Sequence, residues 1–191
     1  SPIEHHATLY ACETLCKEFN VQLHFATHLP NGKLDYEILE QLIETCANKG
    51  KTLVSIMHAN NETGTINDIE KIGVVCKKNE VLFHSDMVQT IGHIPIALSS
   101  LPVDFASGSA HKFHGPKGVG FAFIRKNSGL QPLFFGGEQE KGLRSGTEAI
   151  HQIAGMAKAL EVSYANLEAE QQQISALKQY CLEQLALHFA G

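Results

Sequence analysis

Short apolar runs that alternate with helix-patterned segments constrain the fold of this chain more than any other feature. Three runs are rich in strand-forming residues: "TLVSIM" (52–57), "VLF" (81–83) and 103–107. Apolar residues recur at helical spacing elsewhere: over 4–19, behind a cap at Asp35 (Leu39, Leu42, Ile43, Cys46), over 68–78, and from about Thr147 to the end. This alternation predicts an α/β fold with a mostly parallel sheet and helices on both faces.

Two further segments have strand patterns. "VQLHFA" (21–26) alternates apolar and polar residues, as a half-buried strand does. "GVGFAFIR" (118–125) follows the run at 103–107 after only a short glycine-proline turn. Since parallel neighbours need a long crossover, we expect 118–125 to be an antiparallel strand.

Polar side chains follow three of these predicted strands. They are Asn60 and Asn61 after the first, Asp86 and Gln89 after the second, and Ser109, His111 and Lys112 after the third. Ligands of open α/β sheets bind beyond the carboxyl ends of the strands. We therefore expect one site that these residues line.

Composition excludes several classes of function. With 15 Lys and Arg against 20 Asp and Glu, the formal charge of −5 leaves no basic face for nucleic acid. No apolar run is long enough to span a bilayer, and the first residues show no secretory signal pattern. The five cysteines are scattered and odd in number, which favours reduced thiols and a cytoplasmic location. Cys12 and Cys16 could form half of a metal site, but no second pair follows, so structural thiols are the better interpretation.

Lys112 lies between small residues and a glycine-proline turn. The simplest interpretation of such a lysine is a solvated surface residue. A lysine amine and a carboxylate such as Asp86 at adjacent strand ends also suit pyridoxal 5′-phosphate, which bonds to a lysine and needs an acidic partner at its ring nitrogen. Four histidines could be considered as metal ligands: His5, His6, His58 and His84. They lack the spacing of a metal-binding motif, so we predict no metal site.

Five stretches together resemble the cysteine desulfurases, in the class V aminotransferase-like branch of the fold-type I pyridoxal-phosphate enzymes. These are "IEHHA" (3–7), "VSIMHANNETG" (54–64), "HSDMVQTIGHIPI" (84–96), "SAHKFHGPKGVGF" (109–121) and "GGEQEKGLRSGT" (136–147). The likeness runs in order from residue 1 to about residue 160. Glu138 departs from it, because the family usually has a third glycine there.

The resemblance implies roles for the residues that match it. Lys112 corresponds to the lysine that binds the cofactor covalently and later moves protons. Asp86 corresponds to the partner of the pyridine nitrogen, and Gln89 to the donor to the phenolic oxygen. His5 corresponds to the histidine that stacks on the ring and assists proton transfer.

Four more residues match binding positions of the family. Ser109 and His111 correspond to ligands of the cofactor phosphate, and Asn61 to an asparagine near the substrate carboxylate and ring oxygen. Thr147 corresponds to a threonine that reaches the phosphate of the neighbouring subunit's cofactor, which implies a homodimer.

Simpler interpretations of several residues remain open. His5 near a helix start could be solvated, and Asn61 could be a turn residue. Thr147 could simply cap a helix, and Gln89, on a short helix after Asp86, could be exposed.

The resemblance also implies a division of the chain. Residues 1–160 would be the central part of the large pyridoxal-phosphate-binding domain, and 161–191 a long helix leading toward a smaller C-terminal domain. We expect a phosphate-cradling segment before residue 1, and a persulfide-forming cysteine with a carboxylate-binding arginine after residue 191. We therefore expect the 191-residue chain alone to be inactive.

The implied activity is that of a cysteine desulfurase, which converts L-cysteine to L-alanine and transfers the sulfur to an enzyme persulfide for iron–sulfur cluster or thio-cofactor synthesis. The expected partners are a second copy of the chain and a sulfur-acceptor or iron–sulfur scaffold protein, with no nucleic acid and no membrane. Two alternatives stay open. One is a class V relative, such as a selenocysteine lyase, a kynureninase-like enzyme or an aminotransferase, and the other is a non-catalytic remnant that acts as a binding module.

Overall fold

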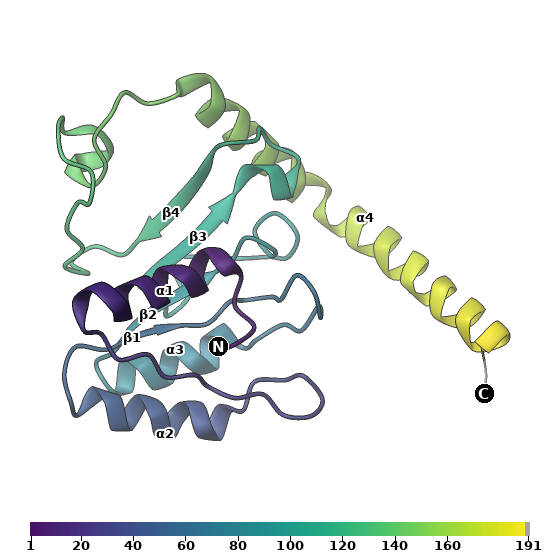
Figure 1. Ribbon diagram of the computed structural model, residues 1–191. Coiled ribbons are helices and arrows are strands. Elements are labelled where there is room, and N and C mark those ends of the chain that lie inside the picture. Colours follow the sequence, from purple (N-terminus) through teal and green to yellow (C-terminus); the bar gives the residue numbers. More distant parts are fainter. Residues whose placement is uncertain (190–191) are drawn as a thin grey trace.

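A computed structural model describes residues 1–189 of the chain (Figure 1). The helices are α1 (His6–Phe19), α2 (Tyr36–Ala47), α3 (Ile69–Lys78) and α4 (Ile150–Phe189). The strands are β1 (Leu53–Ser55), β2 (Leu82–Asp86), β3 (Phe105–Ser109) and β4 (Gly120–Ile124). Two short 3₁₀ helices, η1 (Ala110–Phe113) and η2 (Gln139–Gly142), lie between them.

The four strands form one sheet in the order β1-β2-β3-β4. The strands β1, β2 and β3 are parallel, with Leu53 opposite Leu82 and His84 opposite Phe105. The strand β4 runs antiparallel to β3, with Phe105 opposite Ile124. The predicted α/β fold with a mostly parallel sheet is therefore confirmed, as is the antiparallel strand within 118–125.

Aspartate caps define the starts of α2 and α3. The side chain of Asp35 accepts a hydrogen bond from the backbone N–H of Ile38, and Asp68 accepts one from Lys71. Each carboxylate satisfies a donor that the first helical turn leaves free and faces the positive end of the helix dipole. The predicted helices at 35–46 and 68–78 are confirmed.

The core lies between the sheet and the helices that pack on it. Ile43 of α2, Ile72 and Cys76 of α3, and Phe83 of β2 are all buried. In Figure 1, α1 lies in front of the strands, while α2 and α3 lie side by side below them. Gly73 of α3 is needed for close packing, since a Cβ there would lie 2.4 Å from the ring of Pro102.

The segment 21–26 is not a strand, so this prediction was wrong. Within the described residues, no backbone hydrogen bond joins it to a strand, and residues 21–25 are exposed. An alternating pattern forms a strand only where a neighbouring strand accepts and donates backbone hydrogen bonds. Here the segment lines an apolar hollow of about 620 Å³ together with α1, α2 and β1, and no strand of residues 1–189 is paired with it.

The helix α4 crosses residue 160 without a break. Its N-terminal part contacts η1, and its C-terminal part extends away from the body of the molecule (Figure 1). The division at residue 160 stays a prediction, and the last two residues of the predicted 161–191 segment lie outside the described residues. None of the helices described in residues 1–189 is both long enough and apolar enough to span a bilayer.

Candidate active site

The ends of the three parallel strands meet at one edge of the sheet. Asp86 pairs with Ser107 of β3, two residues before Ser109. The backbone N–H of His58, just beyond β1, donates to the carbonyl of Asp86 over 2.8 Å. The structure therefore places the segment after β1, the end of β2 and the end of β3 side by side.

Asp86 is a buried acid at this edge. It is 8 % exposed, and its Oδ1 accepts a hydrogen bond from the backbone N–H of Val88 over 2.9 Å. That bond forms a tight turn directly after β2 and fixes the direction of the carboxylate. A carboxylate removed from water in this way interacts strongly with any cation or proton donor that reaches it.

Lys112 lies on η1, directly after β3. The turn is anchored by Phe113, whose side chain is fully buried, and ends at His114 with a positive φ of 65°. The Lys112 side chain is exposed, and its amine forms no hydrogen bond or ion pair with any residue in 1–189. The amine is thus available to a ligand.

Ser109 and His111 form a pair beside Lys112. The Ser109 hydroxyl and Nδ1 of His111 lie 2.8 Å apart. A hydroxyl and an imidazole next to one another at a strand end can donate hydrogen bonds to a phosphate or carboxylate.

Two side chains join the segment that carries His5 to the end of β1. Glu4, which is 7 % exposed, accepts from the backbone N–H of Met57 over 3.0 Å. The Nδ2 of Asn60 donates to the carbonyl of Ile3 over 2.7 Å. His5 itself caps α1, because its Nδ1 accepts from the N–H of Ala7 over 3.2 Å. His5 therefore lies at the same edge of the sheet as the strand ends.

No local pattern indicates that Glu4 is buried, since a glutamate before an apolar helix is usually solvated. The sequence pattern places Asn60 only as a polar residue after a strand. In the structure its Oδ1 accepts from the N–H groups of Glu62 and Thr63, each over 2.8 Å. Asn60 thus orders the loop that carries Asn61.

The remaining predicted residues are less tightly placed. Asn61 is exposed, and its Nδ2 donates to Oε1 of the neighbouring Glu62 over 2.9 Å. Gln89 is half-buried in turns after β2, and not on the short helix that we expected. Thr147 is exposed in the segment before α4 and forms no hydrogen bond within the described residues to the other site residues. Its predicted role involves a neighbouring subunit, which a single chain does not test.

These groups suit pyridoxal 5′-phosphate. Lys112 offers an unpaired amine, Asp86 a buried carboxylate, and Ser109 with His111 a hydroxyl–imidazole pair that can donate to a phosphate. No group of three or more His, Cys, Asp or Glu side chains in residues 1–189 could hold a metal ion.

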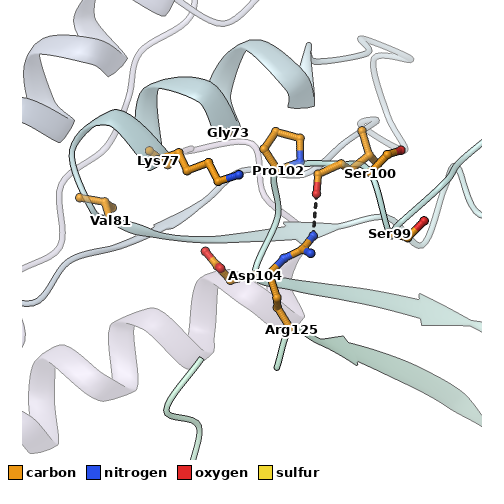
Figure 2. Close-up of a pocket in the computed structure, with 10 residues that line it drawn as sticks. Gly73, Lys77, Val81, Ser99, Ser100, Pro102, Asp104 and Arg125 are labelled. Carbon is orange, nitrogen blue, oxygen red and sulfur yellow. Dashed lines mark hydrogen bonds between the residues drawn. The ribbon is translucent and has the colours of Figure 1, made fainter. Parts of the chain in front are cut away.

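A second hollow, of about 130 Å³, lies at the opposite edge of the sheet (Figure 2). Two of its charged side chains, Arg125 and Asp104, are hydrogen-bonded to the backbone. Arg125 donates to the carbonyls of Leu101 and Val103, each over 2.7 Å. Asp104 accepts from the N–H of Phe83 over 2.9 Å. These bonds hold the loop before β3, so we assign this hollow a structural role.

Two histidines adjoin Asp86: His58 is buried, and His84, two residues before Asp86 on β2, is half-buried. Burial lowers the pKa of His58 and of His84, although nearby Asp86 partly opposes the shift at His84. The Nδ1 of His84 lies 2.8 Å from the hydroxyl of Ser55, and that of His58 lies 3.0 Å from the hydroxyl of Thr90. Both imidazoles are therefore neutral at pH 7.

We expect the free energy of unfolding to fall as the pH is lowered through 6.5, the ordinary pKa that a histidine regains on unfolding. Below that pH the unfolded chain binds protons that the folded chain, with its lowered pKa values, does not. Urea unfolding at pH 7.5 and 5.5 checks this. His84→Asn, whose amide can still reach Ser55, should reduce the loss, and the matched change at exposed His151 should not. An unchanged loss in His84→Asn would contradict the assignment.

The chain matches the family described as Aminotransferase class-V over residues 1–188. It belongs to that family. The class-V match covers both the strand-end residues and most of α4, and so agrees with the resemblance found in the sequence.

Two class-V relatives are named cysteine desulfurase IscS. The protein of Dictyoglomus turgidum is 41% identical over 189 residues, which are 97% of this chain and 46% of that protein. The protein of Methanosarcina thermophila is 41% identical over 186 residues, which are 97% of this chain and 45% of that protein. The chain thus spans about half the length of these relatives.

Solved structures show the same likeness. A NifS-like protein superposes with a TM-score of 0.90 at 42% identity, over 97% of this chain and 50% of that one. The apo structure of a cysteine desulfurase from Thermococcus onnurineus superposes with a TM-score of 0.87 at 25% identity, over 97% and 50%. The predicted fold of a fold-type I pyridoxal-phosphate enzyme is confirmed.

Proposed function

We propose that this chain is part of a pyridoxal-phosphate-dependent cysteine desulfurase, which converts L-cysteine to L-alanine and transfers the sulfur to a protein thiol. The observation that carries the proposal is the placement of Lys112, Asp86 and His5 at one edge of the sheet. The names of the class-V relatives support cysteine as the substrate.

Each residue has a defined task in this proposal. When bound, pyridoxal phosphate withdraws electrons from the α-carbon of an amino-acid substrate. Lys112 would hold the cofactor and then accept and return a proton through its amine. Asp86 would hold a proton at the ring nitrogen through a charge-assisted hydrogen bond. Ser109 and His111 would donate to the phosphate.

The remaining predicted residues complete the site. His5 would cover the ring and assist proton transfer, Gln89 would donate to the ring oxygen, and Asn61 would lie near the substrate carboxylate. Thr147 would reach the phosphate in the neighbouring subunit, which would make the protein a homodimer. The exposed apolar side chains of Leu133 and Phe135, in the segment before Thr147, support burial of that segment by a partner.

Sulfur transfer needs a thiolate. It attacks the substrate sulfur, a sulfur–sulfur bond forms, the carbon–sulfur bond breaks, and the substrate carbon takes up a proton to give alanine. Burial raises the pKa of Cys76 to about 12 and also raises that of Cys12, so both thiols stay protonated at neutral pH. Protonated thiols are poor nucleophiles. We therefore assign the accepting thiolate to a cysteine other than these two, and the resemblance implies one after residue 191.

The five free thiols also support a reducing compartment, and we propose the cytoplasm. The sulfur would pass onward to an acceptor or iron–sulfur scaffold protein, for cluster or thio-cofactor synthesis.

The test is an assay of the protein encoded by the whole reading frame that contains this chain. With pyridoxal phosphate, L-cysteine and a reductant, we expect alanine and sulfide in equal amounts, measured by amino-acid analysis and a colorimetric sulfide assay. L-Selenocysteine and L-kynurenine serve as alternative substrates. Alanine from cysteine at no more than the rate given by free cofactor would contradict the proposal, and turnover of selenocysteine alone would identify a lyase.

A further inference from the structure

The short helix η1 that carries Lys112 is held by side chains from two other parts of the chain. Nε2 of His93 lies 2.7 Å from the carbonyl oxygen of Lys112. The hydroxyl of Ser163, on α4, donates to the carbonyl of Phe113 over 3.3 Å. A third bond supports the first, because Nε2 of Gln171, also on α4, donates to the carbonyl of His93 over 2.8 Å.

These bonds supply what η1 cannot provide for itself. The last carbonyls of a helix have no partner within the helix and need one from outside. The carbonyl of Ala110 accepts from the N–H of Gly115 over 2.8 Å, but those of Lys112 and Phe113 receive only side-chain donors. The orientation of the lysine backbone therefore depends on His93 and α4.

The packing around these bonds is close. Gly92 has a φ of +81°, and a Cβ there would lie 2.7 Å from Cβ of Phe113. Phe113 is fully buried and Ser163 is 4 % exposed. The glycine lets the chain before His93 lie directly on η1, with α4 against both.

The turn formed by residues 87–94, which contains His93, also connects Lys112 to Asp86. This turn begins directly after Asp86, and two backbone hydrogen bonds stabilise it. The N–H of Thr90 donates to the carbonyl of Met87, and the N–H of His93 donates to the carbonyl of Thr90, each over 3.0 Å. One rigid turn thus begins at the acid and ends on the backbone of the lysine.

We propose that His93 is a positioning residue for Lys112. Its imidazole fixes the carbonyl of the lysine, and Gln171 and Ser163 of α4 hold that arrangement, so the turn sets where the amine lies relative to Asp86. The bond needs a hydrogen on Nε2, which is present both in the protonated imidazole and in one neutral tautomer. The consequence for turnover rests on the proposed function, whereas the ordering of η1 does not.

The first test is hydrogen exchange measured by mass spectrometry on the cofactor-free protein. We expect His93→Ala to speed exchange in peptides covering 110–115 by about three- to tenfold, the usual effect of one lost hydrogen bond. His93→Gln, whose amide N–H can reach the position of Nε2, should restore protection, and Gln171→Ala should lose part of it. His151→Ala, an exposed histidine on α4, is the control. Peptides from β1 report whether the fold is intact.

Unchanged exchange in 110–115 for His93→Ala, with β1 still protected, would overturn the proposal. So would equal loss of protection in the Ala and Gln variants, because the bond itself would then not be the cause. If exchange in His93→Ala rises in β1 as well, the fold itself is disturbed, and Gln171→Ala becomes the deciding variant. Loss of protection only in 110–115 of Gln171→Ala supports the proposal, and no loss there overturns it.

The second test uses the protein loaded with pyridoxal phosphate. We expect His93→Ala to lower kcat more than it changes KM, and to shift the pH midpoint of the visible absorbance of the lysine-bound cofactor by about half a unit, both restored in His93→Gln. If exchange in 110–115 changes but the pH midpoint does not, His93 orders η1 without positioning the Lys112 amine, and the positioning role is overturned. Wild-type protein that binds cofactor but forms no alanine would overturn the proposed function and leave the positioning role standing.

Discussion

Replacing Lys112 by alanine is expected to lower the rate of alanine formation from L-cysteine by more than about 10³-fold. The amine is the one basic group in η1 that is exposed and unpaired, so it can both hold the cofactor and carry a proton. Lys112→Arg should be equally inactive, because a guanidinium keeps the charge but does not release a proton at neutral pH. The measurement is steady-state turnover with the cofactor in excess.

Lys117 provides the matched control for Lys112. It is exposed and lies five residues further along the chain, after the glycine-proline turn. Lys117→Ala should retain most of the activity. If Lys117→Ala were inactive and Lys112→Ala active, the two lysines would have been assigned in the wrong order.

Asp86→Asn is expected to lower kcat by about 10²-fold or more, with the fold unchanged. The fold survives because an asparagine Oδ1 can still accept from the N–H of Val88, the bond that forms the turn after β2. The negative charge, however, is lost, and with it a charge-assisted hydrogen bond to the ring nitrogen, worth about 1.5–3 kcal/mol before any effect on electron withdrawal.

The measurement for Asp86→Asn combines kcat with the melting temperature of the cofactor-free protein. Asp68→Asn, a change that keeps the cap of α3, is the control and should leave kcat unaltered. Near-normal turnover in Asp86→Asn would show that this carboxylate does not face the cofactor ring.

The sequence predicted the sheet well because burial leaves a simple signal there. The runs at 52–57, 81–83 and 103–107 each contain or overlap a strand, and the glycine-proline turn correctly indicated an antiparallel β4. The meeting of polar residues at one edge followed from the rule for parallel sheets. It is now visible in the pairing of Asp86 with Ser107.

What the sequence did not reveal depends on partners that are distant in the chain. The alternation at 21–26 matched a strand, but no strand in the described residues is hydrogen-bonded to it. Glu4 is bonded to Met57, and His93 to Lys112, and neither contact leaves a local pattern. In the sequence His93 is one histidine among eleven, and only the fold brings it against η1.

The assignment of Lys112 is tested most directly by reducing the cofactor-loaded protein with borohydride and mapping its peptides by mass spectrometry. Reduction makes the bond between cofactor and lysine permanent, so the modified residue can be identified. We predict the added mass of the reduced cofactor on one peptide, the one containing 109–117, with fragmentation placing it on Lys112. A label on Lys117 or on any other lysine, or no label in protein that turns over cysteine, would contradict the account.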